Sequence, residues 1–333
     1  MASGLSMLTL RPLSMVIPPE PRWGLWLSRR IVASIMDFGG SPLRGTRVEP
    51  VRAQLPDGQH IRGEWVCAPG VSRTGAAIYF VHGSGFALCS PRTHRRLVSA
   101  LSKATGLAVF CVDYRLAPEH RFPAAANDVA AGWEWLTGAR GIAPHQVVIV
   151  GDSAGGHLSV DLLLHEAADR RPAGLVLFSP LIDLTFTLAG ARERVRRDPA
   201  IRVVDAARLV RLYTRDIAPD HPRLRLDVAG GPTLPPSLIQ AGGAEMLRGD
   251  AEQLAKDIRA AGGECELQVW PDQVHVFQAL PRLTRDAAAA LVHAARFVTA
   301  TLQAAGPQDS HPKNPANRLP DASEAPAVTV KSR

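Results

Sequence analysis

One stretch of ten residues constrains the fold of this 333-residue chain more than any other. Residues 147–150 form a run of β-branched side chains, and residues 151–156 read GDSAGG before a helical pattern begins. A serine between Gly151 and Gly155 in such a strand-to-helix turn is typical of a nucleophile elbow, where small neighbours leave room for a strained backbone and an exposed hydroxyl. The same pattern also occurs in ordinary turns, so Ser153 is a candidate nucleophile whose partners must be found elsewhere in the chain.

Short apolar runs alternate with longer segments of helical periodicity on both sides of this turn. The predicted strands lie at residues 77–81, 107–112, 147–150, 174–178, 237–241 and 265–270. The predicted helices lie near residues 94–105, 123–136, from about 154, and near 248–261 and 285–302. This alternation predicts an α/β fold with a mostly parallel central sheet and helices on both faces. Ahead of it, strand-like runs at 46–55 and 60–68 flank a Pro-Asp-Gly turn and predict a β-hairpin.

Three segments flank or interrupt this predicted core. Residues 1–45 carry apolar side chains at helical spacing, which predicts one apolar helix face that caps a pocket, with plain core packing or membrane contact as alternatives. These side chains are Trp23, Trp26, Leu27, Ile31 and Ile35. Residues 183–235 form an Arg- and Pro-rich stretch that predicts a second cap segment, inserted between core parts 46–182 and 236–305. Residues 306–333 lack periodicity and are expected to form a disordered tail.

The charge balance does not favour a nucleic-acid partner. The net charge is +7, but the 38 Lys and Arg residues are scattered among 31 Asp and Glu residues rather than gathered in one tract. Diffuse positive charge is compatible with anionic substrates or an anionic membrane surface. The four cysteines show no paired spacing of the metal or redox type, which favours free thiols and a cytoplasmic location. We expect neither a secretion signal in residues 1–22 nor a transmembrane segment.

The candidate general base follows from chain order. After a serine at a turn of this kind, the acid comes next along the chain and the histidine comes last. The histidines that follow Ser153 are His157, His165, His221, His275, His293 and His311. His275 lies in a loop just after the strand 265–270, which Pro271 ends, whereas the others lie in predicted helices, the insertion or the tail. The sequence therefore predicts His275 as the base.

The candidate acid lies in the loop after the strand 237–241. Glu245 comes four residues after that strand, whereas Asp250 falls in the first turns of the next helix, where a carboxylate also suits the helix dipole. Asp272 is too near His275 in sequence to be preferred and fits a turn position. We therefore expect Glu245 to orient the imidazole, with Asp250 as the alternative.

The sequence HGSGF at 82–86 follows an early strand, and glycines there allow backbone N–H groups to point toward a developing oxyanion. We expect donors from Ser84 and Gly85 together with Ala154, and Gly83 to assist. A phosphate-binding loop is the competing interpretation, but no Lys-Ser/Thr pair follows these glycines.

Taken together, six motifs resemble the hormone-sensitive-lipase-like branch of the α/β-hydrolases across about residues 46–302. They are HGSGF at 82–86, DYRLAPEHRFPAA at 113–125, GDSAGG at 151–156, SPLIDLT at 179–185, GGAEMLRGDA at 242–251 and HVF at 275–277. The family's usual HGGG reads HGSG here, and its usual catalytic Asp is Glu245. Both changes are compatible with the family's reaction. The donors to the oxyanion are backbone N–H groups, which a serine also supplies, and Glu can orient an imidazole as Asp does.

The resemblance implies an α/β-hydrolase fold with a helical cap and a serine carboxylesterase or lipase acting on small, short- to medium-chain esters. It implies no metal and no cofactor. Arg115 and Glu119 are expected to form a structural polar network without a catalytic role. The sequence leaves two alternatives open: an amidase or deacetylase with the same Ser, Glu and His residues, and a ligand-binding protein without activity. It also leaves open whether the protein forms a homodimer.

Overall fold

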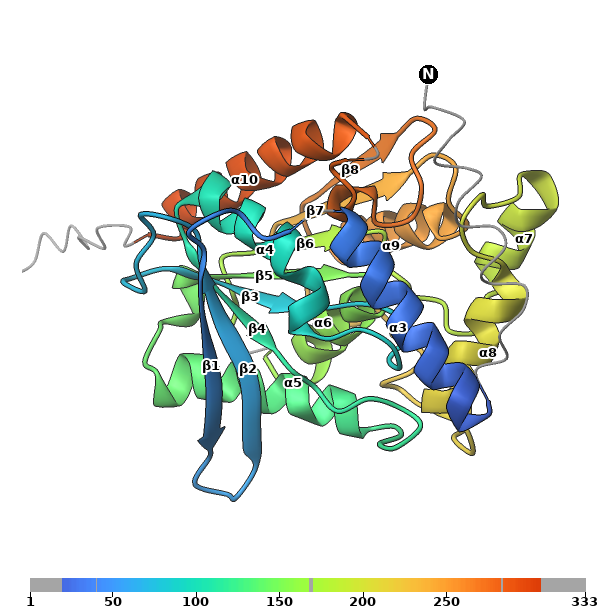
Figure 1. Cartoon of the computed structure of the whole chain (residues 1–333), viewed down its shortest axis with the longest axis horizontal. Helices are drawn as coiled ribbons and strands as arrows, with labels where there is room; N and C mark the ends of the chain where they lie inside the picture. Colours follow the sequence, from blue (N-terminus) through green and yellow to red (C-terminus); the bar gives the residue numbers. More distant parts are fainter. Residues whose placement is uncertain (1–19, 40, 168–169, 283, 307–333) are drawn as a thin grey trace, which may run out of the picture.

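The computed structural model describes residues 20–39, 41–167, 170–282 and 284–306. Eight strands form one sheet in the order β1-β2-β4-β3-β5-β6-β7-β8 (Figure 1). The strands are β1 Arg47–Gln54, β2 His60–Cys67, β3 Ala77–Val81, β4 Ala108–Val112, β5 Val147–Asp152, β6 Gly174–Phe178, β7 Ser237–Gly242 and β8 Cys265–Trp270. The six strands β3 to β8 pair in parallel. The antiparallel hairpin β1–β2 joins this sheet through β2, which pairs antiparallel with β4. The predicted fold class and hairpin are confirmed.

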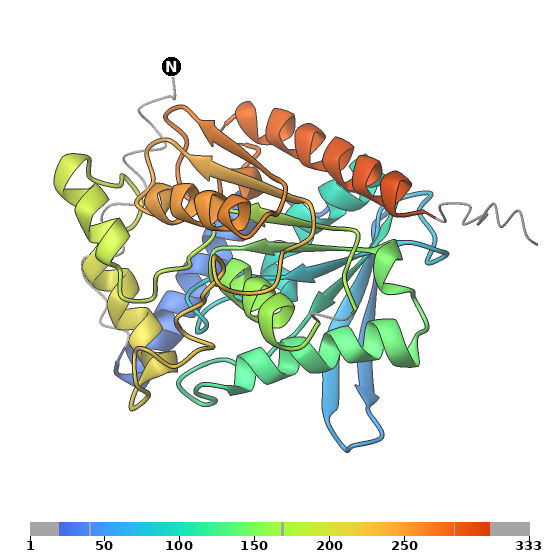
Figure 2. The same cartoon turned by 180° about the vertical axis from the view of Figure 1, so that it is seen from behind.

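Helices cover both faces of the sheet, as the two opposite views show (Figures 1 and 2). The longer helices are α3 Arg22–Gly39, α4 Pro91–Thr105, α5 Ala124–Glu134, α6 Ala154–His165, α7 Thr187–Val195, α8 Val203–Thr214, α9 Arg248–Ala260 and α10 Asp286–Ala305. Short helical turns lie at η1 Trp135–Ala139, η2 Pro144–Gln146 and η3 Phe277–Ala279. Helices α4 and α10 pack on one face, and α5, α6 and α9 on the other.

The central strands are buried along their whole length, and their side chains are mostly apolar because both faces of the sheet are covered. In β5, Val148 and Val150 join the core beneath α4 and α10, whereas Ile149 joins the core beneath α5 and α6. Successive side chains of a strand point to opposite faces, which explains this division. The carboxyl ends of the parallel strands meet at one edge, and the loops that follow them carry the candidate site residues.

The expected helix in the N-terminal segment is present as α3, but its orientation differs from the prediction. Trp23 and Trp26 are 61% and 59% exposed, so they do not share the inward face with Ile31 and Ile35. Four helical positions separate Ile31 from Ile35, which puts them on one face, while Trp23 and Trp26 fall on the opposite side of the helix. The prediction of a single apolar face including both tryptophans is wrong.

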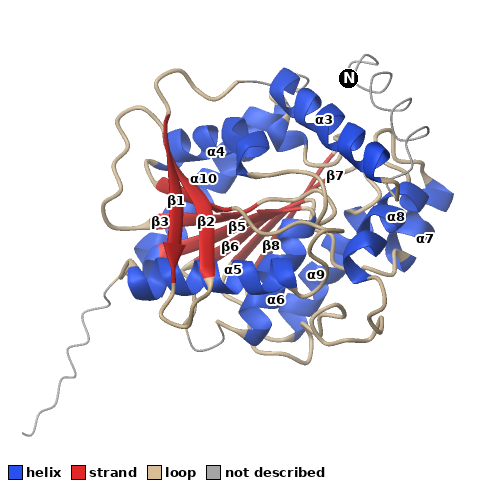
Figure 3. Cartoon of the chain, turned by 60° about the horizontal axis from the view of Figure 1, so that its bottom comes forward, coloured by secondary structure: helices blue, strands red, loops and turns tan. Residues whose placement is uncertain are grey.

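The insertion at 183–235 contains two helices, α7 and α8. Figure 3 shows them at the same end of the molecule as α3, and α7 contacts helix α9. Within the described ranges, no helix is long and apolar enough to cross a bilayer. Of the tail expected at 306–333, residues 307–333 lie outside those ranges, and so do residues 1–19 of the N-terminal segment.

Candidate active site

Ser153 lies in the tight turn between β5 and α6. Its backbone has φ 50° and ψ −121°, a left-handed region that a non-glycine residue adopts at a cost of about 1–3 kcal/mol. The turn also requires glycine on both sides: a Cβ on Gly155 would overlap the carbonyl oxygen of Val81, and one on Gly151 would lie 2.7 Å from the carbonyl oxygen of Gly155. Sequence and geometry therefore agree on a strained elbow that presents the Ser153 hydroxyl.

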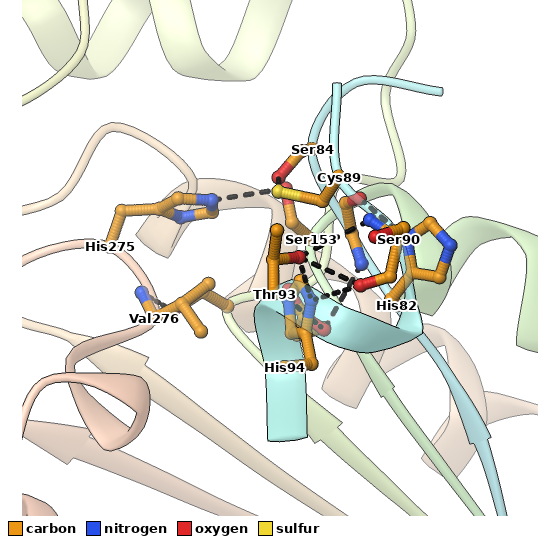
Figure 4. Close-up of polar contacts among 12 residues, drawn as sticks. His82, Ser84, Cys89, Ser90, Thr93, His94, Ser153, His275 and Val276 are labelled. Atoms are coloured by element: carbon orange, nitrogen blue, oxygen red, sulfur yellow. Dashed lines mark hydrogen bonds and ion pairs between the residues drawn. The ribbon is translucent and has the colours of Figure 1, made fainter. Parts of the chain in front are cut away.

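The structure brings the three expected side chains together although they come from different loops. The His275 Nε2 atom lies 3.0 Å from Ser153 Oγ, within hydrogen-bond distance (Figure 4). On the other side of the ring, His275 Nδ1 lies 3.6 Å from Glu245 Oε2, which is an ion-pair distance but too long for a hydrogen bond. Such contacts commonly tighten when substrate binds.

Burial and charge oppose each other at this pair. Burial lowers the pKa of His275, but the Glu245 carboxylate, together with smaller contributions from Asp198 and Asp152, more than offsets this and holds the pKa above the usual 6.5. Burial also raises the pKa of Glu245, against the opposing influence of His275 and of the Ser179 hydroxyl. The carboxylate thus favours a positive imidazole, which is the form that a general base reaches when it accepts a proton.

Two residues that the sequence did not single out hold the acid. The Ser179 hydroxyl donates to Glu245 Oε2 at 2.7 Å and accepts the N–H of Val276 at 3.0 Å. Ser179 is the first residue of the SPLIDLT motif, and that motif was the only sequence signal for it. Asp198, which is 5% exposed, accepts the N–H of Met246 at 2.8 Å. Nothing in the Arg-rich context of Asp198 distinguished it from a surface residue.

The two alternative acids do not contact His275. The buried Asp250 carboxylate accepts the N–H groups of Ile182 and Asp183 at 2.9 Å and 2.8 Å, and burial raises its pKa to about 7. Asp272 faces solvent and pairs with Arg196 at 2.9 Å. The geometry therefore supports Glu245 over both.

The candidate oxyanion loop follows β3. Ser84 and Gly85 have φ angles of 87° and 59°, and no backbone acceptor within the described ranges is bonded to either N–H. Consecutive residues in this conformation can direct their N–H groups into one concavity. Ala154, as the first residue of α6, also has an N–H without an intrahelical acceptor. Gly83 differs, because its N–H donates to Asp152 Oδ1 at 3.1 Å.

A buried polar cluster supports that loop from below (Figure 4). Asp152, the residue before the nucleophile, lies with its Oδ1 atom 3.4 Å from His94 Nε2, and both side chains are at most 3% exposed. Burial lowers the pKa of His94, but the Asp152 carboxylate more than offsets this and raises it. The Tyr114 hydroxyl donates to the carbonyl oxygen of His82 at 2.7 Å. Asp152 thereby ties the elbow, the loop at Gly83 and helix α4 together.

A cavity of about 320 Å³ opens above Ser153 and His275. Its walls come from the loops after the parallel strands, from the inner face of α3 and from α8. The α3 side chains that line it are Ser28, Ile31, Val32, Ile35 and Met36. Those from α8 are Asp205, Ala206, Leu209 and Val210. The lining is therefore mostly apolar, and its polar side chains are Ser28, Ser84, His94, Asp152, Ser153, Asp205 and His275.

Helix α3 is fixed in place by Arg29. This side chain donates to both carboxylate oxygens of Glu119 at 3.0 Å and 2.9 Å, and to the carbonyl oxygens of Ala87 and Ala117. Arg115 pairs in the same way with Asp128. Both residues of the DYRLAPEH motif thus make structural contacts, outside the triad. Within the described residues, no group of three or more His, Cys, Asp or Glu side chains is arranged to hold a metal ion.

Comparison with known proteins agrees with this geometry. Residues 78–279 match a family model described as alpha/beta hydrolase fold. The chain is 37% identical over 245 residues to the carboxylesterase/phospholipase LipF of Mycobacterium tuberculosis. The match covers 70% of this chain and 65% of LipF, so the chain spans slightly less than two thirds of that relative's length. It is also 37% identical to an acetyl-hydrolase of Streptomyces hygroscopicus, over 66% of this chain and 73% of that protein.

Solved structures extend the likeness over nearly the whole of their chains. EstE5, soaked with p-nitrophenyl butyrate, is 31% identical with a TM-score of 0.76, covering 88% of this chain and 97% of EstE5. An esterase from the bacterial hormone-sensitive lipase family is 30% identical with a TM-score of 0.76, covering 91% of this chain and 100% of that one. On its motifs, its fold and these likenesses, the chain belongs to the hormone-sensitive-lipase branch of the α/β-hydrolase family.

Proposed function

We propose that the protein is a serine hydrolase of carboxylic esters. The observation that carries this proposal is the 3.0 Å contact between His275 Nε2 and Ser153 Oγ, beneath a mostly apolar cavity that Ser84 and Gly85 also line. A hydroxyl, a base with a buried carboxylate behind it, and preset N–H donors are the parts that acyl transfer through serine requires.

In the proposed mechanism, Ser153 Oγ attacks the ester carbonyl carbon while its proton passes to His275 Nε2. The N–H groups of Ser84, Gly85 and Ala154 stabilise the resulting oxyanion, and α6 directs its positive end toward the same place. Collapse of the tetrahedral intermediate breaks the C–O bond to the alcohol, which takes the proton from His275. Water, deprotonated by His275, then hydrolyses the acyl-Ser153 ester and regenerates the enzyme.

The substrates that we propose are esters with short to medium acyl chains. A cavity of about 320 Å³ lies at the small end of the range of about 300–1,000 Å³ that is usual for ligand pockets. Its apolar lining favours an alkyl group over a charged one. Butyrate and octanoate esters should therefore be hydrolysed with higher kcat/KM than a palmitate ester of the same alcohol.

Turnover of p-nitrophenyl butyrate by the full chain and by Ser153→Ala tests the proposal. The variant should lose at least about 10⁴-fold in kcat while keeping its circular dichroism spectrum, since removal of a triad serine has an effect of this order or larger. Retained turnover would refute the mechanism. A matched anilide distinguishes an amidase from an esterase, because only an amidase would cleave it. A protein that only binds ligands would cleave neither the ester nor the anilide.

The cellular location is also a proposal. All four cysteines, Cys67, Cys89, Cys111 and Cys265, are free thiols, and the first three are buried. Free thiols suit a reducing compartment, so we propose the cytoplasm.

A further inference from the structure

The outward surface of the cap combines exposed tryptophans with unpaired arginines. Of the five large hydrophobic side chains that are strongly exposed in the described part of the chain, four belong to cap helices: Trp23, Trp26, Val195 and Val204. Only Val292, on α10, lies elsewhere. Isolated exposed hydrophobic residues are common on protein surfaces, so their concentration on one structural unit is the informative feature.

Helix α3 contributes an aromatic and basic outer face. Trp23, Trp26 and Arg30 follow the helical spacing of one face, and the Arg30 guanidinium lies 5.1 Å from the Trp26 ring centroid. The opposite face of α3 carries Ile31 and Ile35 and lines the cavity. Both indole rings are more than half exposed, although their area would favour burial. The helix therefore has two functional faces, one toward the substrate cavity and one toward the surroundings.

Helix α8 continues this surface. The Arg208 side chain donates to both carboxylate oxygens of Glu20 at 2.7 Å and 2.8 Å, which joins α8 to the residues just before α3. The charge of Arg211 also contributes to lowering the pKa of Glu20, so Arg211 lies near the same junction. Val204 and Arg211 fall on the face of α8 that carries Arg208. Figures 1 and 3 show the N-terminal end of α3 close to α8.

We define the outer cap surface by six residues: Arg22, Trp23, Trp26, Arg30, Val204 and Arg211. Its three arginines are exposed and form no ion pair with another residue in the described part of the chain. Indole rings favour the boundary between lipid headgroups and acyl chains, and arginines there attract anionic headgroups. A second copy of the chain would present the same positive surface and a net charge of +7, so the two would repel each other.

We propose that the outer cap surface docks onto an anionic phospholipid membrane. The tryptophans would enter the headgroup region and the arginines would neutralise phosphates around them. Because the inner faces of α3 and α8 line the cavity, docking would hold the substrate site next to the lipid phase from which apolar esters partition. This delivery role depends on the proposed esterase function, whereas the membrane binding itself does not.

Binding of the full chain to vesicles tests the proposal. Flotation with phosphatidylcholine vesicles is compared with flotation on equal mixtures of phosphatidylcholine and phosphatidylglycerol at physiological salt. The anionic vesicles should bind at least roughly tenfold more tightly, and two arginines near the surface should account for much of that factor. Equal binding to both, or binding to neither, would overturn the proposal.

Variants separate the contributions of the surface. Trp23→Ala/Trp26→Ala should weaken binding to anionic vesicles at least about tenfold, and so should Arg30→Gln/Arg211→Gln. The matched controls are Val292→Ala on α10 and Arg44→Gln/Arg171→Gln, which remove exposed apolar area and charge elsewhere and should bind as the parent does. If the cap variants bind as tightly as the controls, the assigned surface is wrong.

Three further readouts distinguish the alternatives. Brominated phospholipid should quench tryptophan emission of the parent and not of Trp23→Phe/Trp26→Phe, because Trp65, Trp133 and Trp135 are buried and Trp270 is partly buried against Phe277. Sedimentation should show the same oligomeric state in the parent and the alanine variant, and a dimer that the substitutions dissociate would show an interface between copies instead. Turnover of soluble p-nitrophenyl butyrate, which involves none of the six residues, should be unchanged in every variant. If no variant or parent hydrolyses the ester, the proposed function fails while the binding result stands.

Discussion

The buried carboxylate of Asp198 accepts the N–H of Met246, the residue that follows Glu245. Asp198 belongs to the cap insertion, between α7 and α8, and its other carboxylate oxygen accepts the N–H groups of Ala200 and Ile201. Ala200 and Ile201 line the cavity. One side chain therefore connects a wall of the substrate cavity with the loop that holds the candidate acid.

This relationship predicts that Asp198→Asn impairs turnover without removing a triad member. The amide retains one acceptor oxygen but presents an NH2 group to the other set of N–H donors, so about 1.5 kcal/mol, or roughly tenfold in kcat, should be lost. The Asp198 charge also raises the pKa of His275, so the acid limb of the pH–rate profile should move to lower pH. An unchanged profile with reduced thermal stability would mean that the role of Asp198 is only structural.

The pH dependence of the parent enzyme follows from His275. A general base must be neutral before it accepts a proton, and the Glu245 carboxylate holds the pKa of His275 above 6.5. We therefore expect kcat/KM to be low in acid and to rise through a midpoint above 6.5. The measurement is kcat/KM for p-nitrophenyl butyrate from pH 5 to 9, corrected for spontaneous hydrolysis. A midpoint at or below 6.5 would contradict the assigned influence of Glu245.

Glu245→Gln and Asp250→Asn distinguish the acid from its neighbour. Glu245→Gln removes the charge that orients and stabilises the imidazolium, and kcat should fall at least about 10³-fold. Asp250→Asn keeps an oxygen that can accept the N–H groups of Ile182 and Asp183, so kcat should fall less than about tenfold. Steady-state kinetics of both variants decide the assignment, which is reversed if Asp250→Asn shows the larger loss.

The sequence was sufficient to predict the sheet and the triad candidates because both follow local rules. Each buried strand is a short and largely apolar run, and Ser153, Glu245 and His275 occupy loops that follow such runs. The orientation of α3 was not predictable in the same way. Hydrophobicity alone assigned Trp23 and Trp26 to the inward face, but Arg29 sets the rotation of the helix through its contacts with Glu119 and nearby carbonyl groups.

The supporting residues were missed for a related reason. Ser179 contacts Glu245, 66 positions away, and Asp198 contacts Met246, 48 positions away. His94 contacts Asp152, which is 58 positions away. No local sequence pattern marks such distant partners. The glycine at 83 was assigned to oxyanion binding on its position in HGSGF, whereas its N–H is already bonded to Asp152. Whether a polar side chain or N–H is free depends on tertiary contacts that a single sequence does not show.

The cluster at His94 predicts a positioning effect on the oxyanion loop. His94→Gln removes the imidazole whose Nε2 atom lies against the Asp152 carboxylate, and the loop at Gly83 should lose its fixed position. We expect kcat to fall roughly ten- to a hundredfold while KM changes less than about threefold, because oxyanion donors act mainly in the transition state. His145→Gln, at an exposed histidine, is the matched control. Equal kinetics of the two variants would show that His94 does not position the loop.

The central claim is that Ser153 carries the acyl group between the two half-reactions. Rapid quenching of the full chain with p-nitrophenyl butyrate, followed by digestion and mass spectrometry, measures this directly. The proposed mechanism predicts a butyryl group on the peptide that contains Ser153, formed together with a burst of p-nitrophenol and absent from Ser153→Ala. Acylation of a different residue, or steady turnover with the same rate in Ser153→Ala, would contradict it.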